Sequence, residues 1–455
     1  MQVLKLIVSI TDILWGGPLL ILIVLTGVFY AGKIRFKFFR YLKNTLKLKN
    51  KQSLAHGEIP LLNCLLTAMA GTIGSGNIVG VAVAISIGGP GSLFWIWTVS
   101  IICMIVKMVE VTMAVSYRVR DSDGKYWGGP MYYISSGIKG TTGSILGKIY
   151  AVFLLILVVT DACFVQVNTF AATFNNLFGF PAILSGVIWV FLGIIILKVK
   201  SGKRINAFCK IFTPFMCIVY IIGAGIIITC NYKCFLAIMK DIFYYAFHPT
   251  PIIGGFTGAS IMMSMSKGFS RGIFSNEAGQ GTSAAIYAKA IVEHPVKAGL
   301  YSVTEVMADC FICTITGFSV LVTSAWKHGL DGITLNLYAF EGQFGIWGKL
   351  FVCVMICFLT FSSYISFFIE YCTSLKYLFS AKIANAASWI YFIPPLFSGI
   401  LSAKFIWTLA DMAVGFIVLP NIAALLILNK KFTQLWKDYG NKLDKESSEN
   451  NLDNT

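Results

Sequence analysis

The sequence predicts an all-α integral membrane protein with eleven transmembrane helices. Hydrophobic residues make up 57% of the 455 positions and charged residues only 12%, about half the charge of a soluble domain. Apolar runs recur with the length, roughly 17 to 30 residues, that a membrane-spanning helix needs. In chain order, these runs cover residues 16–32, 59–86, 92–116, 147–178, 181–198, 206–229, 251–268, 297–324, 346–370, 384–402 and 405–428.

Basic residues predict the orientation of these helices. If the eleven helices alternate, every basic cluster falls on one side, which the positive-inside rule assigns to the cytoplasm. The N-terminus is then outside and the C-terminus inside a bacterial-type cytoplasmic (inner) membrane. The formal charge of +16 thus indicates topology and contacts with lipid headgroups rather than nucleic acid. The clusters lie at 33–51, 118–148, 198–210 and after 429, and the opposite loops 178–181 and 325–349 carry no net charge.

Ten helices follow the first one, and they divide into two sets of five. Because five is odd, the two sets have opposite topology, as in inverted-repeat transporters. We therefore expect four regions. These are an N-terminal lead-in with one extra helix and a basic loop (1–58), a first repeat (59–230), a second repeat that begins with an external linker (231–428), and a polar cytoplasmic tail (429–455), disordered from residue 442.

The glycine cluster at 71–80 interrupts the first helix of the first repeat. It contains four glycines with Thr72, Ser75 and Asn77 among them. Irregular backbone at membrane depth is tolerated only where it is buried in protein or lines a wet cavity. Free N–H groups there can hold a carboxylate and free carbonyls a cation. A helix-packing surface of small residues is the alternative, and a dinucleotide fingerprint lacks the strand that should precede it.

A counterpart is expected in the first helix of the second repeat, at 251–268. This segment contains Gly254, Gly255 and Gly258, and Gly268 and Gly272 follow. Two glycine-interrupted helices at matching positions of two halves indicate a binding site near the middle of the membrane.

Hydroxyl and amide side chains within other apolar runs are further candidates. Ser362 and Ser363 offer hard oxygen donors for a cation such as Na⁺, unless they bond to their own helix. Gln166 and Asn168 suit a zwitterion, or hydrogen bonds between helices. Asp161 lies in the middle of a span, where insertion of a carboxylate into the membrane costs free energy, so it is a candidate contact for the substrate or the cation. At about 100° per residue, Asp161 shares a face with Asn168, and Gln166 points about 140° away from Asp161.

Charged residues within the spans predict structural pairs. Lys107 and Glu110 are three residues apart on one predicted helix, at a spacing that permits pairing. Glu305 and Asp309 share a face and require a cation nearby. Arg271 and Glu277 are expected at a cytoplasmic helix end, as a gate latch or as ordinary capping residues.

Cysteines and histidines show no arrangement typical of a metal or catalytic site. The twelve cysteines are scattered, and Cys230 and Cys234 near an external loop are either two free thiols or a pair. The four histidines lie in or near loops, far apart in the sequence, which disfavours an integral membrane enzyme.

Several motifs resemble the alanine or glycine:cation symporter family, also called the sodium:alanine symporters. Residues 67–78 (TAMAGTIGSGNI) resemble that family's broken first core helix, and 88–97 (GGPGSLFWIW) resemble its signature. Residues 128–134 (GGPMYYI), 271–279 (RGIFSNEAG), Asp309 and 419–421 (LPN) extend the resemblance over nearly the whole membrane region.

The resemblance implies a LeuT-type fold, preceded by one extra helix, that imports small neutral amino acids such as alanine or glycine with Na⁺ as the coupling ion. It places Thr72, Gly74, Gly76 and Asn77 around the polar end of the substrate, with Gln166 nearby; Ser75 lies within the same motif. It assigns Na⁺ to the hydroxyls of Ser362 and Ser363 and to carbonyls near Ala70 and Ile73. The sequence leaves the oligomeric state open and is compatible with a monomer.

Three residues depart strongly from the family pattern, and Ser92 and Ile96 depart from it more mildly. Phe367 stands where the family usually has Trp and leaves a roomier pocket, and Asp161 and Glu305 are extra acids. These departures motivate proton coupling or a larger amino acid as alternatives to Na⁺-coupled uptake of alanine or glycine. A channel is disfavoured by the arrangement of two five-helix halves.

Overall fold

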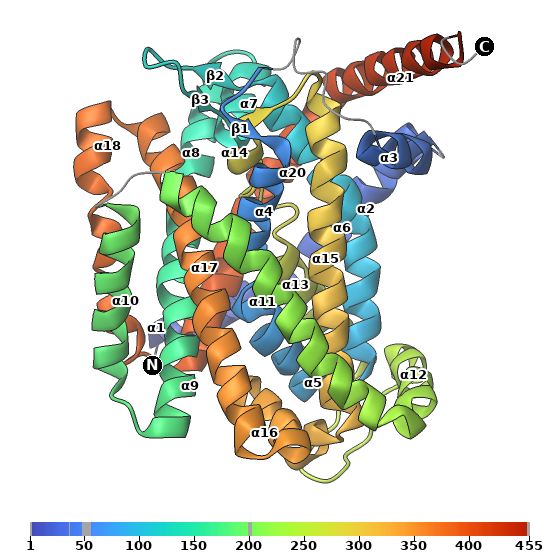
Figure 1. Cartoon of the computed structure of the whole chain (residues 1–455), viewed down its shortest axis with the longest axis vertical. Coiled ribbons are helices and arrows are strands. Elements are labelled where there is room, and N and C mark those ends of the chain that lie inside the picture. The colour runs from blue at the N-terminus through green and yellow to red at the C-terminus, as the bar shows by residue number, and fades with distance from the viewer. Residues whose placement is uncertain (1, 36, 48–55, 199–202, 453–455) are drawn as a thin grey trace.

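A computed structural model describes residues 2–35, 37–47, 56–198 and 203–452. Helices dominate it, and the only strands in the described residues form two short pairs (Figure 1). The elements up to residue 178 are α1 (Gln2–Trp15), α2 (Pro18–Ile34), α3 (Lys37–Lys47), β1 (Ile59–Pro60), α4 (Leu61–Thr72), η2 (Gly76–Gly80), α5 (Val81–Gly88), α6 (Gly91–Ser116), β2 (Val119–Arg120), β3 (Tyr126–Trp127), α7 (Pro130–Gly137), α8 (Thr141–Val158), η3 (Val159–Val165) and α9 (Gln166–Phe178).

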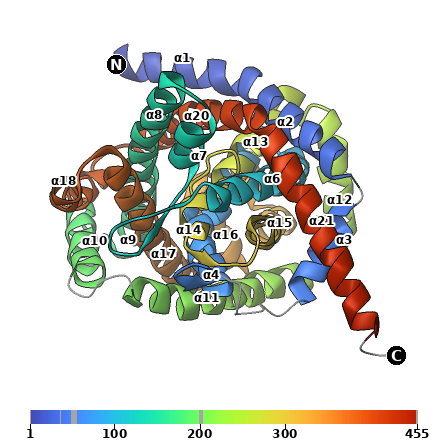
Figure 2. The same cartoon turned by 90° about the horizontal axis from the view of Figure 1, so that it is seen from above.

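The remaining elements complete the bundle that Figure 2 shows from above. They are α10 (Ala182–Leu197), α11 (Lys203–Cys230), α12 (Tyr232–Phe247), α13 (Ile261–Asn276), α14 (Ala284–Tyr287), β4 (Ala290–Ile291), α15 (Pro295–Val322), η4 (Ala325–His328), α16 (Gly332–Phe344), α17 (Ile346–Leu378), α18 (Ala381–Ala387), η5 (Ile390–Phe392), α19 (Pro395–Ser398), α20 (Ala403–Ile427) and α21 (Asn429–Leu452).

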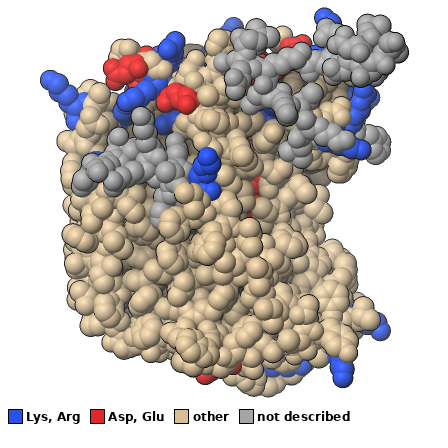
Figure 3. Space-filling view, viewed as in Figure 1, with Lys and Arg blue, Asp and Glu red and all other residues tan. Residues whose placement is uncertain are grey.

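Within the described residues, seven helices are long and apolar enough to cross a membrane, or eight with one bent pair. The predicted count of eleven is not confirmed. Three predicted runs differ from the structure: 181–198 forms the short helix α10, 251–268 is partly loop, and 384–402 is divided among α18, η5 and α19. Most charged side chains in Figure 3 lie at the two ends of the molecule, with an uncharged band between them.

The predicted break in the first core helix is present. α4 ends at Thr72, and after residues 73–75 the chain resumes as the π-helical turn η2 and then α5, at an angle of 51° to α4. All residues from Ala70 to Gly80 are buried, so the open backbone is enclosed by protein, as the membrane environment demands.

The second break lies later than the sequence predicted. Gly254, Gly255 and Gly258 lie in a loop before α13, and Gly268 and Gly272 lie within the continuous helix α13. Cβ atoms at the latter two would be 2.5 Å from the Ser92 carbonyl oxygen and 2.4 Å from a methyl of Val99. These two glycines therefore permit close packing against α6 rather than unwinding.

The chain opens instead at residues 277–283, between α13 and α14. Glu277, Gly279 and Gly281 there have φ values of +55°, +83° and +75°, which terminate an α-helix. The two breaks lie close together: a Cβ atom at Gly71 would be 3.6 Å from Glu277 Oε1, and one at Gly76 would be 3.3 Å from Ser275 Cα.

Packing separates two groups of helices around the breaks. α6 packs most extensively against α13 and α15, and α17 packs against α8 and α9. α4 contacts both groups through α15 and α17. The broken helices thus lie between two sets of continuous helices.

At the basic end of the molecule, the start of the first broken helix meets the end of the second. β1 pairs with β4 in parallel, and the Arg118 guanidinium donates to the carbonyls of Ala290 (2.7 Å), Ala288 (3.0 Å) and His56 (2.7 Å). The sequence predicted disorder from residue 442 onward. This prediction is wrong for residues 442–452, which form the last part of helix α21. Lys442 of α21 pairs with Glu293 at 2.7 Å, which ties α21 to this end.

Candidate functional site

Two hydroxyls of α17 meet the carbonyls at the end of α4. Ser363 Oγ lies 3.1 Å from the Ala70 oxygen and 3.0 Å from the Gly71 oxygen, and Ser362 Oγ lies 3.4 Å from the Ala70 oxygen. Ile73 is fully buried where α4 ends, but among the hydrogen bonds of the described residues none joins its carbonyl to these hydroxyls. Ala70, Ser362 and Ser363 therefore cluster as predicted. Both serines also bond back to the Leu359 oxygen, so the helix-bonding alternative occurs alongside.

Asn77 holds the break open from within the broken helix. Its Oδ1 accepts from the Gly74 N–H at 3.0 Å, and its Nδ2 donates to Asp309 Oδ1 at 2.6 Å. Asp309 Oδ1 also accepts from Ser275 Oγ at 2.6 Å, so one carboxylate joins the two broken helices. Asp309 was not among the predicted site residues, although an acid in the middle of a span was a signal for it.

Gln166 links the break to α9 and to Asp161. Its Oε1 accepts from the Ser75 N–H at 3.1 Å, and its Nε2 donates to Asp161 Oδ1 at 2.7 Å. The predicted separation of Gln166 from Asp161 is wrong because residues 159–165 form a π-helix, which bonds i to i+5 and brings residues five apart onto one face. Asn168 instead donates to the carbonyls of Ser398 and Leu401.

The other predicted substrate residues are buried near this break or in the core. The Thr72 hydroxyl bonds back to Ala68 and Met69 at 3.3 and 3.4 Å, and Gly76 packs on Ser275. Phe367 is 1% exposed within the hydrophobic core. The buried polar atoms around the two breaks that have no partner in the described residues include Ser75 Oγ, Asn276 Nδ2, Ser283 Oγ and Asp309 Oδ2.

Arg271 and Glu277 do not pair with each other. Arg271 pairs with Asp411 of α20 and lies under the Trp407 ring, with 4.7 Å between its guanidinium carbon and the ring centroid. Glu277 accepts from Thr282 within the second break. The expected position at a helix end is wrong for Arg271, because α13 continues to Asn276, whereas Glu277 is the C-cap of this helix.

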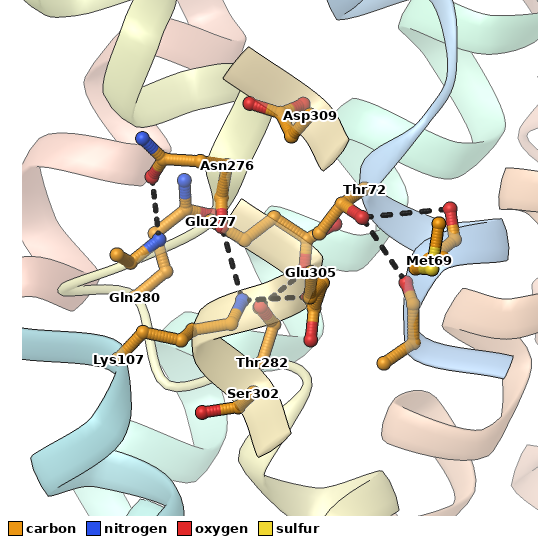
Figure 4. A network of polar contacts seen from close by, with 12 residues as sticks. Met69, Thr72, Lys107, Asn276, Glu277, Gln280, Thr282, Ser302, Glu305 and Asp309 are labelled. Carbon is orange, nitrogen blue, oxygen red and sulfur yellow. Dashed lines mark hydrogen bonds and ion pairs between the residues drawn. The ribbon is translucent and has the colours of Figure 1, made fainter. Parts of the chain in front are cut away.

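Lys107 lies at the centre of a buried network (Figure 4). Its ammonium is 2.9 Å from Glu305 Oε1 and donates to the Asn276 carbonyl at 3.0 Å, at the end of α13. The predicted Lys107–Glu110 pair does not form, because Glu110 accepts from Asn421 of α20. Glu305 does have the nearby cation that its position on α15 required.

Buried acids outnumber buried bases. In the described part of the chain, six carboxylates are less than 5% exposed, whereas Lys107, Arg271 and Lys297 are the bases buried to this extent. Arg271 and Lys297 pair with Asp411 and Glu293. An excess of buried carboxylates stabilises bound cations or protons in a medium of low dielectric constant. The six acids are Glu110, Asp161, Glu277, Glu305, Asp309 and Glu370.

Known relatives cover almost the whole chain. Sodium/alanine symporter AgcS of Methanococcus maripaludis is 31% identical over 442 residues, which span 94% of this chain and 95% of that protein. Probable sodium/glutamine symporter GlnT of Bacillus subtilis is 32% identical over 448 residues, 96% and 91% of the two chains. Amino-acid carrier protein AlsT of Bacillus subtilis is 30% identical over 431 residues, 94% and 90%.

A solved structure shares the fold. The crystal structure of MhsT in complex with L-phenylalanine matches with a TM-score of 0.57 and 14% identity, over 84% of this chain and 95% of that one. The shared fold is of the LeuT type. The sequence profile described as the sodium:alanine symporter family matches residues 1–453. This chain therefore belongs to the sodium:alanine symporter family, whose members are membrane transporters and not enzymes.

Proposed function

We propose that this protein imports small neutral amino acids, alanine or glycine, with Na⁺ by alternating access. The observation that carries the proposal is the meeting of the Ser362 and Ser363 hydroxyls with the carbonyls of Ala70 and Gly71. Hydroxyl and carbonyl oxygens are hard, neutral donors that suit Na⁺, and they gather where the backbone of α4 leaves the helix. Ala70, Ile73, Ser362 and Ser363 form the proposed cation site.

The amino acid is proposed to bind beside this cation, at the break. Its carboxylate would accept hydrogen bonds from N–H groups at Gly74 and Ser75, which now bond to Asn77 and Gln166. Asp161, held by Gln166, offers a charge to the ammonium group. Thr72, Gly76 and Phe367 complete the proposed set of substrate-binding residues.

Transport follows from opening the two ends in turn. Entry of one positive charge through 100 mV releases about 2.3 kcal/mol, which supports roughly fiftyfold accumulation per coupled ion. The repeats 59–230 and 231–428 would move relative to each other around the breaks. Arg271 keeps a gating role in this proposal, with Asp411 as its partner in place of Glu277.

Proton coupling is the second candidate, and the buried acids favour it. Glu370 is 1% exposed, and neither of its carboxyl oxygens has a hydrogen-bond partner in the described residues, a position that stabilises the protonated form. A larger substrate is also compatible with Phe367 in place of Trp and with the name of the sodium/glutamine relative.

Uptake of labelled alanine into proteoliposomes tests these proposals, with Na⁺ and pH gradients imposed separately. A Na⁺ gradient alone should drive accumulation. Uptake that is driven by the pH gradient and does not depend on Na⁺ would favour proton coupling. If glutamine competes more strongly than alanine or glycine, the larger substrate is correct.

Ser363→Ala should raise the Na⁺ concentration for half-maximal uptake by about tenfold. The substitution removes one hydroxyl donor from the proposed cation site, and a lost hydrogen-bond-type contact to a charged group is worth about 1.5 kcal/mol or more. Ser374→Ala, on the same helix and also buried, is the matched control. Equal Na⁺ dependence in the two variants would remove Ser363 from the site.

A further inference from the structure

Three lysines gather around Cys372 of α17, at the end of the molecule that carries β1 and β4. The charged groups that act on this half-buried thiol are Lys198, Lys289 and Lys376, all of them cations. They come from three segments: Lys198 caps the end of α10, Lys376 lies in the last turn of α17, and Lys289 lies between α14 and β4. A surface built from one sign of charge by three separate segments suits an anionic partner.

Trp127 of β3 holds two of these lysines close to each other. The Lys289 and Lys376 nitrogens lie 4.5 and 4.1 Å from the centroid of its ring. Neither ammonium group has a hydrogen bond or an ion pair with the described residues, and contact with a ring leaves N–H donors unused. Burial lowers the pKa of Lys289, and the Lys376 charge acts in the same direction. An anion placed between the two would relieve their repulsion.

The nearest acids do not neutralise this cluster. Glu58 and Asp121 lie close enough to act on the two lysines beside Trp127, yet neither forms an ion pair with them in the described residues. Their carboxylates accept instead from the Tyr126 N–H and from the Trp127 indole N–H. Three lysines and two acids leave the cluster with a net positive charge.

Lys198 places the third charge beside apolar rings. Its nitrogen lies 4.8 Å from the Trp389 ring centroid and 5.3 Å from that of Phe368. Phe368, Cys372 and Lys376 follow one another at intervals of four residues along α17, so they share one face of the helix. The cluster is therefore continuous from the apolar ring of Phe368 to the charge of Lys376.

Exposed apolar side chains adjoin these lysines. They belong to residues 379–393, which follow α17, and α10 and α18 lie next to each other at one edge of the bundle (Figures 1 and 2). Cations between helices beside an exposed apolar surface are typical of sites for acidic phospholipids, whereas a soluble anion would use only the charges. The side chains, each between 46% and 54% exposed, are Phe379, Ile383, Trp389, Ile390 and Ile393.

We propose that Lys198, Lys289 and Lys376 form a binding site for the phosphate headgroup of an anionic phospholipid. The unused donors of Lys289 and Lys376 bind phosphate oxygens, Lys198 binds the outer side of the headgroup, and the acyl chains lie along the exposed apolar side chains of residues 379–393. Because each lysine comes from a different segment, the bound lipid ties α10 and α17 to the segment that follows the second break. The site goes beyond the proposed function and requires neither Na⁺ nor an amino acid.

Binding of acyl-labelled phosphatidylglycerol to the purified full-length protein in detergent tests the site. The wild type should bind one molecule per chain at saturation, and phosphatidylcholine, which has no net charge, should bind at least tenfold more weakly. Lys289→Gln and Lys376→Gln should each weaken binding of phosphatidylglycerol about fivefold, the factor expected for one lysine near an anionic surface. Lys376→Arg keeps the charge and should bind as the wild type does, which separates lost charge from altered folding.

Lys148→Gln is the matched control, since Lys148 is an exposed lysine of α8 outside the cluster. It should bind the lipid as tightly as the wild type. Equal weakening by Lys148→Gln and Lys376→Gln would indicate general attraction to a basic surface and would contradict the site, as would equal affinity for the two lipids. If inorganic phosphate displaces the labelled lipid as effectively as unlabelled phosphatidylglycerol does, the cluster holds a free anion and the lipid proposal is wrong. None of these outcomes bears on uptake, so the proposed function stands or falls separately.

Discussion

Buried ionisable side chains in this protein find their partners on other helices. Lys107 of α6 pairs with Glu305 of α15 and bonds to the end of α13, so three helices meet at one ammonium group. A buried pair of this kind contributes little net stability when complete. Removal of one partner is expensive because the other charge stays buried.

Lys107→Met should lower the free energy of unfolding by about 3–5 kcal/mol, because it leaves Glu305 without its cation. Unfolding in a denaturing detergent, followed by tryptophan fluorescence, measures the change. Lys107→Met combined with Glu305→Met should recover most of the loss. Lys349→Met is the control, since its pair with Glu341 is 28% and 43% exposed and is worth at most about 1 kcal/mol. Equal losses for Lys107→Met and Lys349→Met would contradict the buried pair.

The breaks are the elements on which the site depends. At the first, Gly74 adjoins both neighbouring helices: a Cβ atom there would lie 2.4 Å from Ser363 Oγ and 3.2 Å from Gln166 Oε1. Only glycine leaves the space in which the carbonyls of α4 and the hydroxyls of α17 meet. The π-helical stretch η3 also shapes this site, because it places Gln166 and Asp161 within hydrogen-bond distance of each other.

Gly74→Ala should reduce Na⁺-dependent uptake at least tenfold, since its methyl group occupies the contact with Ser363. Gly80→Ala in the same cluster should retain most activity, because its nearest neighbour would be 3.6 Å away, an ordinary van der Waals contact. Initial rates normalised to the amount of reconstituted protein measure both. Comparable rates in the two variants would show that the space beside Gly74 is not needed.

At the scale of the whole molecule, most charged side chains on the face in Figure 3 lie at the two ends, with an uncharged band between them. The β1–β4 pair and α21 lie at one end, and α12 and α16 lie at the other (Figure 1). From the positive-inside rule, we propose that the end that carries β1, β4 and α21 faces the cytoplasm. Cys230 and Cys234, which lie near α12, are exposed free thiols and report on this orientation.

A membrane-impermeant maleimide should label intact cells at Cys230 and Cys234, because that end faces outward in the proposed topology. The other ten cysteines are buried or only partly exposed, so the variant with both residues changed to serine should lose the label. A cysteine added at Lys437 of α21 should react only after the cells are opened. Labelling of that cysteine in intact cells would reverse the orientation.

The sequence by itself determined the class of protein, the position of the first break and the residue types of the proposed cation site. Apolar length, the glycines at 71–80 and the hydroxyls of Ser362 and Ser363 are local properties. It did not determine which side chains meet. Lys107 and Arg271 find their partners where two helices pack against each other, and Asp161 meets Gln166 because residues 159–165 form a π-helix. From the sequence, Gly268 and Gly272 were expected to belong to a helix break. Only the tertiary structure showed that they instead let α6 pack closely against α13. Periodicity describes one helix at a time, whereas pairing and packing depend on several helices that are distant in the sequence.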